Sequence, residues 1–211
     1  MKRFLMLVLF GSLLAGCGAQ PKQPNIFENP VCEPPCWMNI TPGVTTKVDA
    51  LTIMTKIDAI DQPIVDPNQP FMEFDDAFHF TFYNDINRLG FVYIVNDRVS
   101  MISFTYKLDI TLQRAIELFG TPQSILVEHA GEFDAVTFLN PQRGIEFGHR
   151  FHLDESSEIK PEVDITGVAF FDPKQYRLFL NSGFFSYTSV NVDEALKRMR
   201  PWEDTEASTG I

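Results

Sequence analysis

The sequence of 211 residues lacks the short motifs that mark many enzyme active sites. It contains no Gly-x-Ser-x-Gly nucleophile elbow, no His-Glu-x-x-His zinc-binding pair and no glycine-rich loop that would hold phosphate groups. The best metal-binding candidates are His149 and His152, with Asp154 and Glu155 beside them. On a strand this spacing places the two imidazole rings on opposite faces, which is poor geometry for shared ligation. We therefore predict no catalytic residue, no metal and no cofactor.

Positively charged residues are scarce. The chain has 17 Lys and Arg residues against 28 Asp and Glu residues, a formal net charge of -11. Removal of residues 1–16, which hold Lys2 and Arg3 and no acidic residue, would leave 15 basic and 28 acidic residues, a net charge of -13. Such a surface repels nucleic-acid phosphates and anionic headgroups, so we predict no nucleic-acid partner. The ordinary role of an acidic surface is solubility.

The apolar run at the N-terminus, Phe4 to Leu14, is too short to span a bilayer as a stable helix. It follows Lys2-Arg3 and ends in Leu14-Ala15-Gly16-Cys17, which resembles the bacterial lipoprotein signal. The resemblance implies that residues 1–16 are removed and that Cys17 is acylated with two or three chains. The protein would then be extracytoplasmic and anchored to a bacterial membrane. The alternative is an ordinary secretory signal in which the cysteine occurs by chance.

Only three cysteines are present, and Cys32 and Cys36 remain once Cys17 carries lipid. Export places them in an oxidising compartment, so we predict a disulfide between them. The Pro34-Pro35 pair between them excludes a helix and favours a tight bend. Redox, metal-binding or unpaired thiols are the alternatives. The polar, proline-containing residues 17–31 are predicted to form a flexible tether.

Residues 32–108 are predicted to form a module of one helix followed by antiparallel strands. Thr45 or Thr46 can cap the helix, because a hydroxyl accepts a hydrogen bond from a first-turn N–H. The expected apolar face consists of Val48, Leu51, Ile53, Met54 and Ile57. A proline-containing loop over residues 58–70 precedes the strands. The strand predictions are Phe71 to Tyr83, and Gly90 to Val95 with Val99 to Tyr106 as a hairpin about Asn96-Asp97-Arg98.

The same order of elements returns in residues 109–203, so we predict a second module there. Asp109 or Thr111 can cap its helix, and Gly120-Thr121-Pro122 ends it. The expected apolar face consists of Leu112, Ala115, Ile116 and Phe119. The predicted strands are Ser124 to His129, Ala135 to Leu139, Gly144 to Phe151 and Ile165 to Phe171. A C-terminal helix that includes Glu194 closes this module, and residues 204–211 are predicted to be a disordered tail.

Three segments carry a resemblance to a known family. Residues 40–51 (ITPGVTTKVDAL) resemble the helix entry of the small BamE-type lipoproteins of the outer-membrane barrel-assembly machinery, and residues 112–122 (LQRAIELFGTP) resemble their helix exit. Residues 90–99 resemble their strand-turn-strand segment. The resemblance implies an α+β fold of tandem helix-on-antiparallel-sheet modules, as in the β-lactamase-inhibitor-protein-like group. The Cys-x-x-x-Cys-Trp entry is similar instead to uncharacterised bacterial envelope lipoproteins. A single α+β sheet domain with unrelated helices is the alternative.

Phenylalanine is abundant, with 20 residues. Phe78, Phe80 and Phe82 alternate with polar residues, which favours a sheet core over an exposed recognition surface. The neighbouring Asp75-Asp76 and His79 have no nucleophile nearby, and we interpret them as residues of the sheet surface.

The predicted function is a non-catalytic protein-binding or scaffolding module at the cell envelope, with an envelope protein as its partner. Phe184, Phe185 and Tyr187 form the expected partner surface, because two adjacent phenylalanines cannot both face one core on a strand. A small-ligand receptor is the first alternative, and it requires an apolar pocket between sheet and helices. A hydrolase that uses the His149 and His152 region or a pair of carboxylates is the second.

Overall fold

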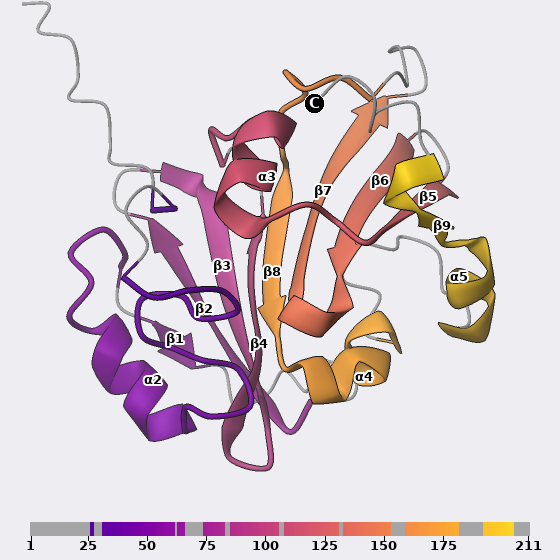
Figure 1. Cartoon of the computed structure of the whole chain (residues 1–211). Coiled ribbons are helices and arrows are strands. Elements are labelled where there is room, and N and C mark those ends of the chain that lie inside the picture. Colours follow the sequence, from indigo (N-terminus) through magenta and orange to yellow (C-terminus); the bar gives the residue numbers. More distant parts are fainter. Residues whose placement is uncertain are drawn as a thin grey trace, which may run out of the picture.

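The computed structural model is an α+β fold built on one antiparallel sheet (Figure 1). It describes residues 26–27, 31–61, 63–65, 74–82, 85–105, 108–130, 133–152, 159–181 and 192–204. The predicted signal peptide and Cys17 lie outside these ranges, as do Phe184, Phe185 and Tyr187. Within the described ranges, no helix is both long enough and apolar enough to cross a membrane.

The sheet is made by two units with the same order of elements. The first unit comprises α2 (Lys47–Met54), β1 (Ile64–Val65), β2 (Asp76–Phe82), β3 (Asp85–Val95) and β4 (Arg98–Thr105). The second comprises α3 (Leu112–Phe119), β5 (Ser124–Ala130), β6 (Phe133–Asn140), β7 (Ile145–His152) and β8 (Gly167–Phe171). The chain then forms α4 (Tyr176–Asn181), α5 (Val192–Arg198) and the short β9 (Arg200–Pro201). Three-residue 3-10 turns lie at Pro141–Arg143, Pro173–Gln175 and Trp202–Asp204.

The strand order is β1-β2-β3-β4-β8-β7-β6-β5-β9, so the last strands of the two units pair at the centre. Figure 1 shows α2 beside β1 at one end of the sheet and α5 beside β5 and β9 at the other. The predicted strands are confirmed. The predicted hairpin turn is confirmed too, because Asn96 and Asp97 have φ values of 50° and 59° between β3 and β4. Both central residues of a two-residue hairpin turn need positive φ, which Asn and Asp tolerate. The strand β1 was not expected within the predicted loop.

The helices α2 and α3 begin with the same kind of hydrogen bond, from a backbone N–H of the first turn to a threonine hydroxyl. Thr46 Oγ1 accepts from the backbone N–H of Asp49 at 3.2 Å, and Thr111 Oγ1 accepts from Arg114 N–H at 3.3 Å. The predicted caps are therefore confirmed at Thr46 and Thr111. Gly120, with φ of 89°, ends α3 as predicted.

The backbone around each cap is hydrogen-bonded in the same way to the residues where the chain enters the last strand of the unit, which are 97–99, before and within β4, and 163–165, before β8. In both units the residue before the cap accepts a hydrogen bond from this entry, and the residue after the cap donates one to it. The bonds are Val99 N to Thr45 O and Lys47 N to Asp97 O in the first unit, and Ile165 N to Ile110 O and Leu112 N to Val163 O in the second. The two units therefore share their local geometry as well as their order of elements.

The main core lies between the sheet and the α2 and α3 helices. Phe78, Phe80 and Phe82 project into it from β2 and are 0–3% exposed, as their alternation predicted. The prediction that Val48 belongs to the buried face of α2 is wrong, because its side chain is 67% exposed. Met54 is buried against the sheet as predicted, together with Ala50, which the predicted face did not include. A helix turns by about 100° per residue, so Val48 points away from the face that contains Ala50.

The opposite face of the sheet is also covered, a feature not expected from the sequence. The helix α4 packs there through Phe179, whose ring stacks on Phe171 of β8 at a centroid distance of 4.2 Å. Further along this face, Ala195 of α5 packs with Leu126 and Leu139. The sheet therefore has apolar clusters on both faces.

Gly90 is a position where the core leaves no room for a side chain. A Cβ atom added there would lie 2.1 Å from Phe80 Cζ. The substitution Gly90→Ala is expected to lower the free energy of unfolding by about 1–3 kcal/mol, because overpacking displaces neighbouring atoms. Urea titration measures this loss, and adding Phe80→Leu should recover part of it. Equal stability of Gly90→Ala and the wild type would contradict the prediction.

Candidate functional site

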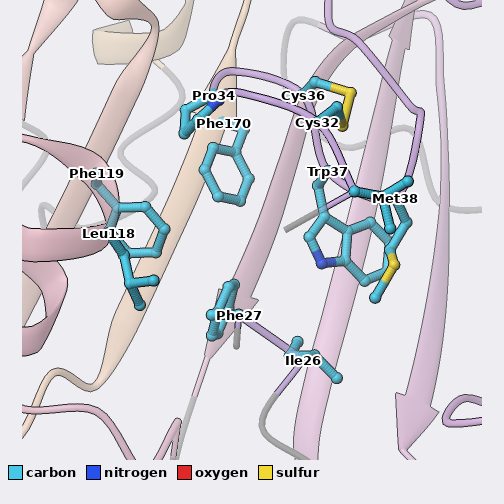
Figure 2. A pocket seen from close by; sticks show the side chains of 11 residues that line it. Ile26, Phe27, Cys32, Pro34, Cys36, Trp37, Met38, Leu118, Phe119 and Phe170 are labelled. Atoms are coloured by element: carbon cyan, nitrogen blue, oxygen red, sulfur yellow. A yellow bond between two sulfur atoms is a disulfide. The ribbon is translucent and has the colours of Figure 1, made fainter. Parts of the chain in front are cut away.

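The main candidate site is an apolar hollow between α3 and the entry segment, which we define as residues 26–27 and 31–40 (Figure 2). The empty space between its walls is about 370 Å³, part of it open to solvent, and the centres of water-sized molecules can occupy about 20 Å³ of it. Its walls are Ile26, Phe27, Val31, Cys32, Pro34, Cys36, Trp37, Met38, Leu118, Phe119 and Phe170. The first eight come from the entry segment, the next two from α3 and the last from β8.

The entry segment is held by two local constraints. The predicted disulfide between Cys32 and Cys36 is confirmed, with an S–S distance of 2.03 Å, and Cys36 N donates to Glu33 O across the enclosed turn at 3.1 Å. A second tight turn follows, in which Trp37 and Ile40 exchange backbone hydrogen bonds of 2.9 and 2.8 Å. These turns direct Trp37 and Ile40 into the core, where they are 4% and 0% exposed.

The indole of Trp37 forms one wall of the hollow. Its ring stacks on Phe80 at a centroid distance of 5.8 Å and meets the ring of Phe104 edge-on at 4.8 Å. The indole nitrogen Nε1 is buried and has no hydrogen-bond partner among the described residues. In Figure 2 this nitrogen lies on the side of the ring turned toward Phe27 and Phe119, across the hollow.

Phe27 forms the opposite wall of the hollow. The prediction of a flexible tether over residues 17–31 is therefore wrong at this residue. Phe27 lies within residues 17–31, yet it is only 3% exposed. Its ring meets those of Phe104 and Phe119 edge-on, at centroid distances of 5.3 and 5.7 Å. The tether prediction failed here because Ile26-Phe27 is a short apolar pair in a polar, proline-containing stretch, and the partners of Phe27 are distant in the sequence.

A second unusual group of side chains lies on the opposite face of the sheet. Glu128 of β5 and Glu146 of β7 are 1% and 3% exposed. Burial raises the pKa of Glu146 well above its ordinary value, and the charge of Glu128 raises it further. Burial likewise raises the pKa of Tyr176 on α4, and the charge of Glu146 adds to that shift. A protonated Glu146 is the form that this environment favours.

The burial of these two carboxyl groups was not expected from the sequence. In β7, Glu146 alternates with the apolar Ile145 and Phe147, a pattern typical of a solvated outer face. The face is covered because α4 and α5 pack on it. A helical spacing of aromatic residues at Tyr176 and Phe179 was the signal that could have indicated this cover.

Asp75, Asp76 and His79, which lie close together in the sequence, contact different partners in the fold. Asp76 pairs with Lys47, and Asp75 Oδ2 accepts from the backbone N–H of Asn96 at 2.6 Å. The His79 ring lies 6.2 Å from the ring of Phe91 instead. These residues are thus engaged in separate local contacts.

Of the two histidines of β7, His149 and His152, the structure describes the side chain of His149 only. His149 contacts the backbone carbonyl of Asp164 through Nδ1, and its ring meets that of Phe151 edge-on. Asp154, Glu155 and the side chain of His152 lie outside the described part of the chain. Among the side chains that are described, no group of three or more His, Cys, Asp and Glu residues is arranged to hold a metal ion.

Comparisons with models of known protein families, with curated proteins and with solved structures found no match to this chain.

The buried carboxyl group of Glu146 predicts a pH-dependent stability. Between its ordinary pKa of 4.5 and its raised pKa in the fold, the unfolded chain releases this proton before the folded chain does. The free energy of unfolding should therefore fall as pH rises above 4.5, by about 1.4 kcal/mol per pH unit from this group. Glu146→Gln should remove this slope, so that it gains on the wild type as pH rises and differs little below pH 4.5. Parallel pH profiles in urea titrations would count against the prediction.

Proposed function

We propose that this protein is a bacterial envelope lipoprotein, anchored to a membrane through acyl chains on Cys17, that works as a non-catalytic protein-binding module. The signal-like residues 1–16 support the anchor. The disulfide between Cys32 and Cys36 supports an extracytoplasmic location, because such bonds persist in oxidising compartments. We expect neither catalysis nor a cofactor.

The shared geometry of the two units supports a tandem repeat of the BamE-type, β-lactamase-inhibitor-protein-like kind. Each unit has a threonine-capped helix of eight residues, and the backbone on either side of the cap is hydrogen-bonded to the entry into the unit's last strand. Aligned on the caps Thr46 and Thr111, the buried Ala50 of α2 matches the buried Ala115 of α3. The resemblance to that group implies an envelope protein that acts by contact.

The observation that carries the proposed binding role is a difference in polarity between the outer sides of α2 and α3. The outer side of α3 is polar, with Gln113, Arg114 and Glu117 exposed. On the outer side of α2, Val48 is 67% exposed, and Val44 just before the helix is 63% exposed. Val48 on α2 matches the glutamine Gln113 on α3. An exposed apolar side chain at a position that is polar in the other unit supports a contact surface on α2.

Phe184, Phe185 and Tyr187 are the second proposed part of the partner surface. They lie outside the described residues, so the case for them rests on their adjacency in the sequence. The proposed partner is another envelope protein.

The anchor is tested by replacing its cysteine. The Cys17→Ser variant should lose incorporation of labelled palmitate and should leave the membrane fraction, whereas the wild type should retain both. The Cys32→Ser/Cys36→Ser variant controls for a general effect of losing cysteine, and it should stay labelled and membrane-bound. If Cys17→Ser is processed and distributed like the wild type, the N-terminus is an ordinary secretory signal.

The partner surface is tested by cross-linking in cells. A photo-activated residue at position 48 should capture one recurrent envelope protein, and the same residue at the matched position 113 should not. Val48→Gln should lower the yield of that partner about fivefold, because an interface anchor is worth roughly 1 kcal/mol or more. Its free energy of unfolding should stay within about 0.5 kcal/mol of the wild type, since position 48 is exposed. Equal capture at positions 48 and 113 would reject α2 as the contact surface.

A further inference from the structure

We propose that the outer side of α2 binds a second copy of this chain, with the two α2 helices packed antiparallel about Thr52. This inference rests on the proposed contact surface on α2, and it identifies the envelope protein that meets that surface. The contact surface would remain, and this inference would fail, if a different protein were bound there.

The outer side of α2 carries a stripe of four exposed side chains. They follow one another at intervals of four, four and three residues, which places them on one side of a helix, and they are Val44, Val48, Thr52 and Thr55. Val44 lies just before the helix, and Thr55 is its C-cap. The stripe points away from the side that carries the buried Ala50, at the end of the sheet where Figure 1 shows α2.

The two threonines of the stripe satisfy their own hydroxyl groups. Thr52 Oγ1 donates to the backbone carbonyl of Val48 at 2.9 Å, and Thr55 Oγ1 donates to that of Thr52 at 2.9 Å. Covering a hydroxyl group costs free energy mainly when the group loses its hydrogen bond to water. These two donors keep their bonds when the stripe is covered, so the stripe can be buried against an apolar surface.

The matched stripe of α3 has the opposite character. Aligned on the caps Thr46 and Thr111, the stripe positions correspond in α3 to Asp109, Gln113, Glu117 and Gly120. The first three of these are exposed and polar. The same kind of helix therefore accepts polar residues along the whole stripe, which supports contact as the reason for the valines of α2.

The charges beside the stripe favour a second copy in antiparallel orientation. Asp49 and Lys56 are both exposed and lie seven residues apart, which is two helical turns, so they border the stripe on the same side. Lys56 continues the last turn, because its N–H donates to Ile53 O at 3.0 Å. Their midpoint is next to Thr52. An antiparallel pair centred there places Asp49 of each copy opposite Lys56 of the other, and it also opposes the two helix dipoles.

The size of the contact makes the membrane anchor important. A helix of eight residues is about 12 Å long, so two such helices bury less than the ~1,200 Å² of a typical stable interface. Copies anchored in one membrane through Cys17 have a raised effective concentration, which compensates for weak binding. We therefore expect pairing on the membrane and monomers of the lipid-free protein at micromolar concentration.

The test uses two differently tagged copies of the full-length protein, both with Thr52→Cys, produced in the same cells. Cys32 and Cys36 are paired and Cys17 is proposed to carry lipid, so the added cysteine supplies the free thiol. Mild oxidation of the membranes should join the two tags through a disulfide, because position 52 meets itself at the centre of the pair. Glu117→Cys, at the matched exposed position of α3, should join them far less.

Charge exchange separates contact between copies from damage to α2. Asp49→Lys should lower the linked fraction of the Thr52→Cys protein about fivefold, because it turns two attractive pairs into repulsive ones. Adding Lys56→Asp should restore the linkage, since the pairs form again with their charges exchanged. Both substitutions oppose the helix dipole, so a purely structural effect would be larger in the double variant than in Asp49→Lys alone. Urea titration of each variant measures that structural effect.

The outcomes distinguish this inference from the proposed function. Linkage of the two tags that is lost in Asp49→Lys and recovered in the double variant supports pairing of copies through α2. The inference is overturned if Thr52→Cys joins the tags no better than Glu117→Cys, or if the double variant links no better than Asp49→Lys. Capture of a different envelope protein alone, from position 48 or 52, overturns it and leaves the proposed function in place. Capture of nothing at position 48 rejects both.

Discussion

The pairing of β4 with β8 is the interaction on which the rest of the structure depends. Its five residue pairs are arranged symmetrically about Ser103 and Ala169, which lie opposite each other. Without this pairing each unit would end in an open strand edge, a surface that proteins avoid leaving uncovered. The pairing also brings Phe104 and Phe170 together, at a centroid distance of 6.2 Å, so the two units share one core. One continuous sheet is thus formed by two units that have the same order of elements.

The entry segment breaks the symmetry of this arrangement. It lies over the first unit through Trp37, which packs on Phe80 and Phe104. It reaches the second unit through Phe27, which packs on Phe119 (Figure 2). The hollow exists because this single segment has to cover parts of both units. Its apolar walls and its indole donor therefore come from chain regions that meet only in the complete fold.

Local patterns predicted most of the elements and little of the site. The face of α3 followed from Leu112 and Phe119, since a helix with one apolar side can be placed from its periodicity alone. The helix α2 carries apolar residues on both sides, so periodicity misplaced Val48. The disulfide was predicted from the cysteine count together with the expectation of an oxidising compartment. The burial of Phe27 and Glu146 depends on contacts distant in sequence, and no local pattern contains that information.

The position of Phe27 has a mechanical consequence. A pull applied to the chain at Phe27 acts on a ring that packs between Phe104 of β4 and Phe119 of α3. The load is then divided between the two units at their shared centre, whereas a tether joined to β1 or β9 would peel strands from an edge. The disulfide shields only residues 32–36 from extension, so a pull that freed Phe27 would pass across this bond to Trp37, the next buried ring of the entry segment.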